Sequence, residues 1–102
     1  MCSSDLGDRH ARHLYTVLID PPVAGCDRDQ VRERLRATGV MTSVHFPALH
    51  LEPFYAEHFG YRAGMCPVAE RIAGQTLSLP FSSSLSDDAV DAVIQRVRGL
   101  WR

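Results

Sequence analysis

Residues 40–80 read VMTSVHFPALHLEPFYAEHFGYRAGMCPVAERIAGQTLSLP. This stretch holds most of the chain's histidines, prolines and aromatic residues. Its prolines and glycines are too frequent for one long helix, and its apolar content is too high for a disordered linker. We therefore expect these residues to lie against a pocket or a partner.

Three segments predict short strands: residues 13–20 (HLYTVLID), 40–46 (VMTSVHF) and 76–79 (TLSL). A proline follows each of them and stops it, because proline cannot donate to a strand ladder. The first segment is a nearly continuous run of apolar and β-branched residues, which predicts a well-buried strand. In the second, the alternation of side chains places His45 on the face opposite Val44.

Four segments predict helices: residues 27–38, 53–59, 67–75 and 86–102. Asp27 and Gln30 can form a capping box at the start of the first helix, and Gly39 suits a left-handed cap at its end. The two middle helices each begin with proline, which is favoured at the first helical position. Ser86 can cap the last helix, whose apolar residues recur at helical spacing. If Trp101 is buried there, its truncation to alanine should cost on the order of 3 kcal/mol.

This order of elements predicts an α+β fold, a small two-layer domain with a short three-stranded sheet and helices on one face. The length of 102 residues suits one domain, which buries roughly 65% of its unfolded surface. The other face of so small a sheet needs cover. We expect a missing domain to supply it.

The charge of the chain excludes several function classes. The net charge of −1 provides no basic surface for nucleic acid. No apolar run approaches the roughly 18 residues of a membrane span. All 11 basic residues are arginine. The chain therefore cannot supply the lysine of a Schiff-base mechanism.

The N-terminal residues 1–6, MCSSDL, lack the basic and apolar regions of a signal peptide. They resemble the translation of a common sequencing adaptor, so we expect them to be non-native and the gene to be truncated at its 5′ end. The 3 cysteines include no C-x-x-C pair. Their odd number argues against a disulfide framework and favours the cytoplasm.

Few residues in the chain have the spacing of a known metal-binding, catalytic or phosphate-binding motif. His45, His50 and His58 do not follow a zinc-binding pattern, so we expect no metal site. Cys66 stands at a helix start that could activate a thiol, but a small residue beside the helix cap explains it more simply. No glycine-rich phosphate loop is present. His45 and His50, which flank a Phe-Pro turn in an apolar loop, are the best candidates for pocket residues.

Four motifs occur in order within residues 8–102: T-S-V-H-F-x-A-L-H-L-x-P-F-Y, C-P-V-A-E, L-S-L-P and D-D-x-V-x-x-V-I. Together they resemble the C-terminal small domain of DegT/DnrJ/StrS sugar aminotransferases, which are fold-type I pyridoxal-phosphate enzymes. The resemblance implies amino transfer from glutamate or glutamine to a nucleotide-linked keto-sugar. It also implies a homodimer with shared active sites. Residues 7–102 would be the small domain of such an enzyme.

The resemblance divides the expected site between two domains. The family's lysine, its carboxylate beside the cofactor and its phosphate-binding residues lie in the large N-terminal domain. We therefore expect no catalytic residue, cofactor or metal in this chain. His45 and His50 match the family's substrate-side histidines, and Phe46 lies beside them, so all three are expected to contact the sugar. Tyr15 is a weaker candidate, because the core of the first strand explains it more simply.

Three functions are consistent with these observations. The first is a C-terminal fragment of a sugar aminotransferase that is inactive alone. The second is a non-catalytic docking domain of a split enzyme. The third is part of a dehydratase relative in which a histidine replaces the cofactor lysine; that replacement would lie in the missing domain.

Overall fold

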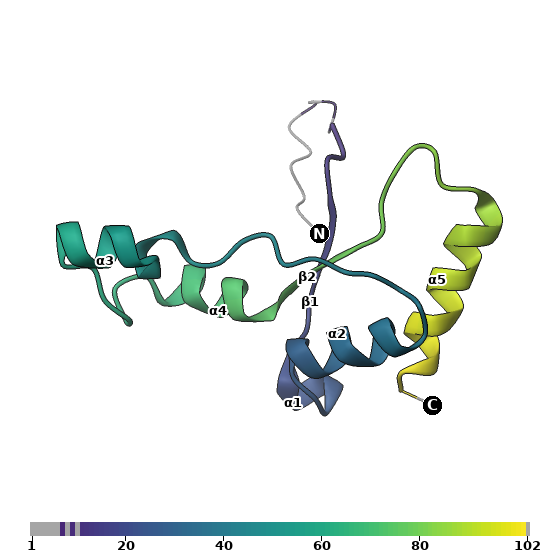
Figure 1. The fold of residues 1–102 in the computed structure, drawn as a ribbon, viewed down its shortest axis with the longest axis horizontal. Helices are drawn as coiled ribbons and strands as arrows, with labels where there is room; N and C mark the ends of the chain where they lie inside the picture. Colours follow the sequence, from purple (N-terminus) through teal and green to yellow (C-terminus); the bar gives the residue numbers. More distant parts are fainter. Residues whose placement is uncertain (1–6, 8, 10, 102) are drawn as a thin grey trace.

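The computed structural model describes residues 7, 9 and 11–101, so the expectation for residues 1–6 lies outside the described part of the chain. The elements follow in the order β1 (Tyr15–Leu18), α1 (Pro21–Ala24), α2 (Arg28–Ala37), the 3₁₀ turn η1 (Leu49–Leu51), α3 (Pro53–Phe59), α4 (Pro67–Gln75), β2 (Thr76–Leu79) and α5 (Asp87–Gly99) (Figure 1). Among the described residues, no helix has the length and apolar character needed to cross a bilayer.

The sheet has two antiparallel strands, β1 and β2, where the sequence predicted three. The segment 40–46 adds only an isolated bridge between Ser43 and Ser78. The ends of this segment explain the difference. The Val40 N–H is bonded to the Leu35 carbonyl at the end of α2 (2.9 Å), and Pro47 prevents pairing beyond residue 46.

Strand β1 is less buried than its sequence predicted. Tyr15 and Leu18 are 49% and 48% exposed, whereas Ile19, just after the strand, is 7% exposed. Val17 packs against the core, while Leu18 points to the other face of the sheet. The proline that ends the extended segment also begins a helix that we did not predict, because the fixed φ of Pro21 suits the first position of α1.

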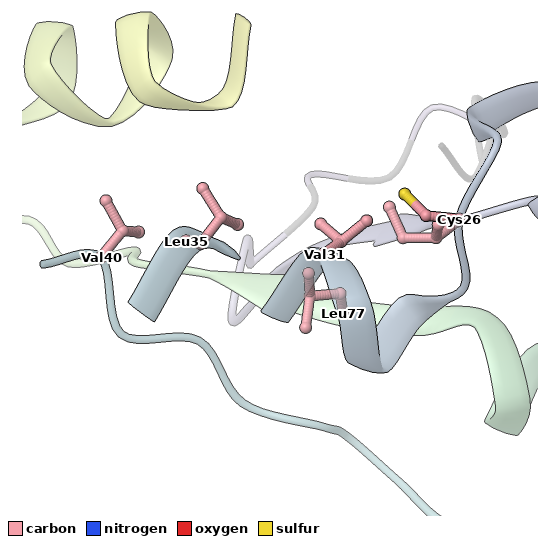
Figure 2. Packing of buried hydrophobic residues seen from close by; sticks show 6 residues of the cluster. Cys26, Val31, Leu35, Val40 and Leu77 are labelled. Carbon is pink, nitrogen blue, oxygen red and sulfur yellow. The ribbon is translucent and has the colours of Figure 1, made fainter. Parts of the chain in front are cut away.

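Helix α2 covers one face of the sheet and begins as predicted. Asp27 accepts a hydrogen bond from the Gln30 N–H (2.8 Å), and the Gln30 side chain accepts one from the Asp27 N–H (3.0 Å). Gly39 follows the helix with a φ of 89°, which only glycine adopts without strain. The buried hydrophobic core consists of Ile19, Cys26, Val31, Leu35, Val40 and Leu77 (Figure 2).

Residues 47–75, here called the arm, extend away from this core and contain η1, α3 and α4 (Figure 1). None of these three elements has a buried residue. The large apolar side chains exposed on the arm are Leu49, Leu51, Phe54, Phe59, Tyr61, Met65, Val68 and Ile72. The Cα radius of gyration is 16.1 Å, against about 13 Å for a compact domain of 100 residues. The arm therefore presents apolar surface that the described chain does not cover.

Helix α5 begins at the predicted cap, where the Ser86 hydroxyl accepts a hydrogen bond from the Ala89 N–H (3.2 Å). Val93, Val97 and Leu100 pack against the core cluster. The helical spacing of these residues in the sequence predicted this contact. The C-terminal end of the chain is thereby joined to α2 and the sheet.

Trp101→Ala should reduce the free energy of unfolding by about 1–2 kcal/mol, not the 3 kcal/mol expected for a buried tryptophan. The side chain is 48% exposed, and its indole Nε1 donates a hydrogen bond to the Ala24 carbonyl (2.8 Å). Urea unfolding followed by circular dichroism measures the loss. Trp101→Phe keeps an aromatic ring but has no N–H donor. Its free energy of unfolding should fall between those of the unsubstituted chain and Trp101→Ala. An unchanged stability in Trp101→Ala would show that the indole does not close α5 onto α1 in solution.

Candidate functional site

His45 lies at the edge of the sheet beside β2. Two hydrogen bonds between Ser43 and Ser78, of 2.7 and 3.1 Å, fix the chain just before it. Because side chains alternate along an extended segment, His45 shares the face of Ser43 and Ser78. Its Nδ1 atom is 2.8 Å from the Ser78 hydroxyl oxygen. This contact engages one ring nitrogen of His45 and leaves Nε2 as the candidate ligand-binding atom.

Two buried hydroxyl groups of β2 support His45. Thr76 and Ser78 are only 3% and 4% exposed, while Leu77 between them points into the core. The Thr76 hydroxyl donates to the His45 carbonyl (3.4 Å), and Ser78 holds the imidazole ring. Sequence analysis did not single out either residue. The alternation in T-L-S-L was the available signal, because it places both hydroxyls on the face opposite the buried leucine.

Phe46 extends this surface toward solvent. Its ring centroid is 4.8 Å from that of His45, with the rings inclined by 71°, and the peptide bond between the two residues is cis. The Phe46 side chain remains 66% exposed. An imidazole beside an exposed aromatic ring can hydrogen-bond a hydroxyl or carbonyl group and pack against the apolar face of the same ligand.

His50 lies in η1 with 11% of its side chain exposed. Its Nε2 atom is 3.5 Å from a carboxylate oxygen of Glu70. This distance is too long for a well-formed hydrogen bond, and Nε2 is a buried atom with no hydrogen-bond partner in the described part of the chain. The contact is therefore an electrostatic one, in which the carboxylate faces the ring nitrogen.

Glu70 is the residue of this region that sequence analysis missed. Its carboxylate accepts hydrogen bonds from the Gly64 N–H (2.9 and 3.1 Å) and the Cys66 N–H (3.3 Å). The bond from Gly64 does most to lower the pKa of Glu70 below its ordinary value of 4.5, and Cys66 and His50 add to this, although burial opposes it. The signal in the sequence was C-P-V-A-E, where a glutamate follows a proline-initiated first turn.

The sign of this shift sets the pH range over which Glu70 stabilises the fold. A lowered pKa in the folded chain means that the carboxylate form is favoured by folding. This contribution is fully present above the ordinary pKa and is lost as the pH falls through the lowered value. At neutral pH Glu70 is therefore ionised and bound to both backbone N–H groups.

Tyr15, the weaker candidate, lies apart from the two histidines. Its ring is 6.4 Å from that of Phe81, and no hydrogen bond or ring contact among the described residues joins it to His45 or His50. The two histidines are also held separately, one by Ser78 and the other by Glu70. The structure thus assembles two supported histidines, with Phe46 beside the first.

Metal and thiol chemistry find no support in the geometry of the described residues. No group of three histidine, cysteine, aspartate or glutamate side chains in this part of the chain could hold a metal ion. Cys66 is exposed, and its side chain makes no hydrogen bond at the start of α4. His58 stacks on the Phe54 ring at 4.3 Å and contacts its carbonyl, as residues four apart on a helix do.

Comparison with proteins of known sequence shows extensive similarity to one family. The family described as DegT/DnrJ/EryC1/StrS aminotransferases matches residues 2–98. The spore coat polysaccharide biosynthesis protein SpsC of Bacillus subtilis is 42% identical over 93 residues, which are 90% of this chain and 24% of that protein. The erythromycin biosynthesis sensory transduction protein EryC1 of Saccharopolyspora erythraea is 42% identical over 86% of this chain and 22% of its own.

Solved structures have the same local fold. The aminotransferase TlmJ of Streptoalloteichus hindustanus superimposes with a TM-score of 0.69 and 38% identity, over 85% of this chain and 21% of that one. Helicobacter pylori PseC, an aminotransferase involved in the biosynthesis of pseudoaminic acid, has a TM-score of 0.75 at 24% identity, over 87% of this chain and 23% of its own. At that identity the second comparison concerns the fold alone.

The chain spans about a quarter of the length of the relatives that it matches. The family match extends across residues 2–98, a range that contains both histidines of the candidate site. The chain belongs to the DegT/DnrJ/EryC1/StrS aminotransferase family.

Proposed function

We propose that residues 7–102 form the C-terminal small domain of a pyridoxal-phosphate-dependent nucleotide-sugar aminotransferase. In this proposal His45, Phe46 and His50 form the wall of the active site on the sugar side. The observation that carries it is the support of both histidines by separate polar partners, Ser78 and Glu70, in a chain of an aminotransferase family. Tyr15 is the weakest member of the set, because its ring packs beside Phe81.

The residues of this chain do not fit pyridoxal phosphate itself. The cofactor of such enzymes is held through a lysine, and all 11 basic residues here are arginine. We propose that the cofactor-binding residues belong to the remaining three-quarters of an enzyme of this family, and that this chain alone transfers no amino group. Glutamate or glutamine as the donor, and a homodimeric enzyme, are parts of the same proposal.

The exposed apolar side chains of the arm favour the proposal that another domain covers it. Phe54 is 58% exposed, Val68 is 62% exposed and Leu49 is 63% exposed, although apolar side chains of this size are usually buried. A group of large apolar side chains exposed together commonly marks an interface. We propose that the large domain covers the arm and so completes the site. The free Cys26 and Cys66 accord with the cytoplasmic location that we propose.

Incubation of the 102-residue chain with pyridoxal phosphate and borohydride should leave no phosphopyridoxyl group on any side chain. The physical reason is the absence of a lysine amine to form the imine that borohydride reduces. Mass spectrometry of the digested protein measures the outcome, with a lysine-containing protein treated in parallel. A stable adduct on a side chain would contradict the proposal that this chain does not bind the cofactor.

The function itself is tested by grafting residues 11–98 into TlmJ in place of the matching segment, which is 38% identical. The grafted enzyme should remain folded and retain the aminotransferase activity of TlmJ, whose amino acceptor is a keto-sugar under this proposal. Its KM for that sugar should change more than the rate of the half-reaction with the amino donor, because the graft replaces only the sugar side. A folded graft that reacts with the donor but never with the sugar would overturn the assignment.

A further inference from the structure

Three residues from two segments of the arm converge on the carboxylate of Glu70. Its oxygens accept the N–H of Gly64 at 2.9 and 3.1 Å, from the loop of residues 60–66. They also accept the N–H of Cys66 at 3.3 Å, directly before α4. The third contact is His50 of η1, whose Nε2 atom is 3.5 Å away. One side chain thus joins a loop, a helix start and a candidate ligand-binding residue.

The loop is shaped for this contact. Gly64 has a φ of 93°, in the left-handed region that a residue with a side chain adopts only with strain. This conformation directs its N–H at the carboxylate. Since no Cβ would meet another atom within 4 Å at Gly64, the backbone conformation and not a lack of space explains the glycine. The arm has no buried residue in η1, α3 or α4, so the polar contacts of Glu70 add to the aromatic ring contacts of α3 in holding its shape.

The contact with His50 has a chemical consequence. Nε2 is buried and has no hydrogen-bond partner among the described residues, and the nearby anion is Glu70. A proton on Nε2 is therefore favoured, because it faces a carboxylate. Nδ1 is then the ring nitrogen left for a ligand, and in the neutral ring it is an acceptor suited to a hydroxyl group.

We propose that Glu70 is a positioning residue of the sugar site, which locks the 60–66 loop and the His50 imidazole into one unit and leaves His50 Nδ1 to accept a sugar hydroxyl. The part that concerns the sugar rests on the function proposed above. The part that concerns the lock depends only on contacts within this chain. Glu70 acts through His50 and does not touch the reacting atoms.

The lock is tested on the 102-residue chain by NMR. Glu70→Ala should accelerate amide exchange at Gly64 by roughly fivefold or more, since a charge-assisted hydrogen bond is lost. Glu70→Gln, which keeps a carbonyl acceptor, should show a smaller increase. In His50→Phe the pKa of Glu70, followed at its carboxyl carbon, should rise toward its ordinary value. Glu57→Gln, at an exposed position on α3, should leave Gly64 exchange unchanged. Unaltered exchange in Glu70→Ala, or unaltered titration in His50→Phe, would overturn the lock.

The positioning role is tested in the TlmJ graft. Glu70→Ala and His50→Ala should each raise the KM for the sugar about five- to tenfold, with a change in kcat below about twofold, and Glu70→Gln should recover part of the loss. A raised KM in His50→Ala but not in Glu70→Ala would overturn the positioning role. If neither variant changes KM while the NMR result holds, the proposed function of His50 fails and the lock stands. The two failures are therefore distinguishable.

Discussion

Leu77→Ala should abolish cooperative unfolding of this chain or leave it only marginally folded. Leu77 is fully buried at 0% exposure, in the middle of β2 and against Val31 and Leu35 of α2 (Figure 2). Truncating a buried leucine costs about 3–5 kcal/mol when the cavity cannot collapse. A domain rarely has more than about 5–15 kcal/mol of stability, and the core here is a single small cluster. Urea unfolding followed by circular dichroism measures the effect.

Leu49→Ala is the matched control, because it removes the same atoms from a side chain that is 63% exposed on the arm. Its effect on the free energy of unfolding should stay within about 0.5 kcal/mol, as for most surface substitutions. A loss equal to that of Leu77→Ala would contradict the fold described here. Such a result would mean that the arm is packed in solution. Unfolding at several protein concentrations would then show whether a second copy covers it.

His45→Ala in the TlmJ graft should raise the KM for the sugar about tenfold or more. The Nδ1 atom of His45 is held by Ser78, so Nε2 is the nitrogen that would bind the sugar in the proposed site. Loss of one such hydrogen bond from a partly buried site costs about 1–3 kcal/mol. The half-reaction with the amino donor should keep its rate, because we propose that the residues that bind the cofactor lie outside this segment. Steady-state and single-turnover kinetics separate the two effects.

His58→Ala is the control for this experiment. His58 is exposed and stacks on Phe54 of its own helix, with no contact to His45 or His50 among the described residues. Its replacement should leave both the sugar KM and the donor half-reaction unchanged. A donor half-reaction that slows in His45→Ala while the sugar KM stays constant would show that His45 serves the cofactor side.

Residues 27–38 show how far local sequence reasoning extends. The capping box of α2, the glycine after it and the burial of Val31 and Leu35 follow from contacts within a few residues of one another. The strand predicted over residues 40–46 depends instead on which backbone groups remain free. The Val40 N–H is used by the end of α2, and only Ser43 pairs with β2. The local sequence pattern does not show whether these backbone groups bond to α2 or to β2.

The candidate site divides in the same way. The position of His45 and His50 on either side of a Phe-Pro turn in an apolar loop singled them out in the sequence. Their supports did not stand out, because Ser78 is 33 residues from His45 and Glu70 is 20 residues from His50. A hydroxyl in a strand and a glutamate in a helix are common. Only the folded chain shows that each faces an imidazole.

The sequence by itself determined helices α2 to α5, the family and the absence of lysine in this chain. Each of these follows from local spacing, motifs or composition. The tertiary structure decided the number of strands, the exposure of the arm and the partners of the two histidines. These depend on contacts between residues far apart in the chain. Their free energy comes from long-range burial and hydrogen bonding, which no local propensity specifies.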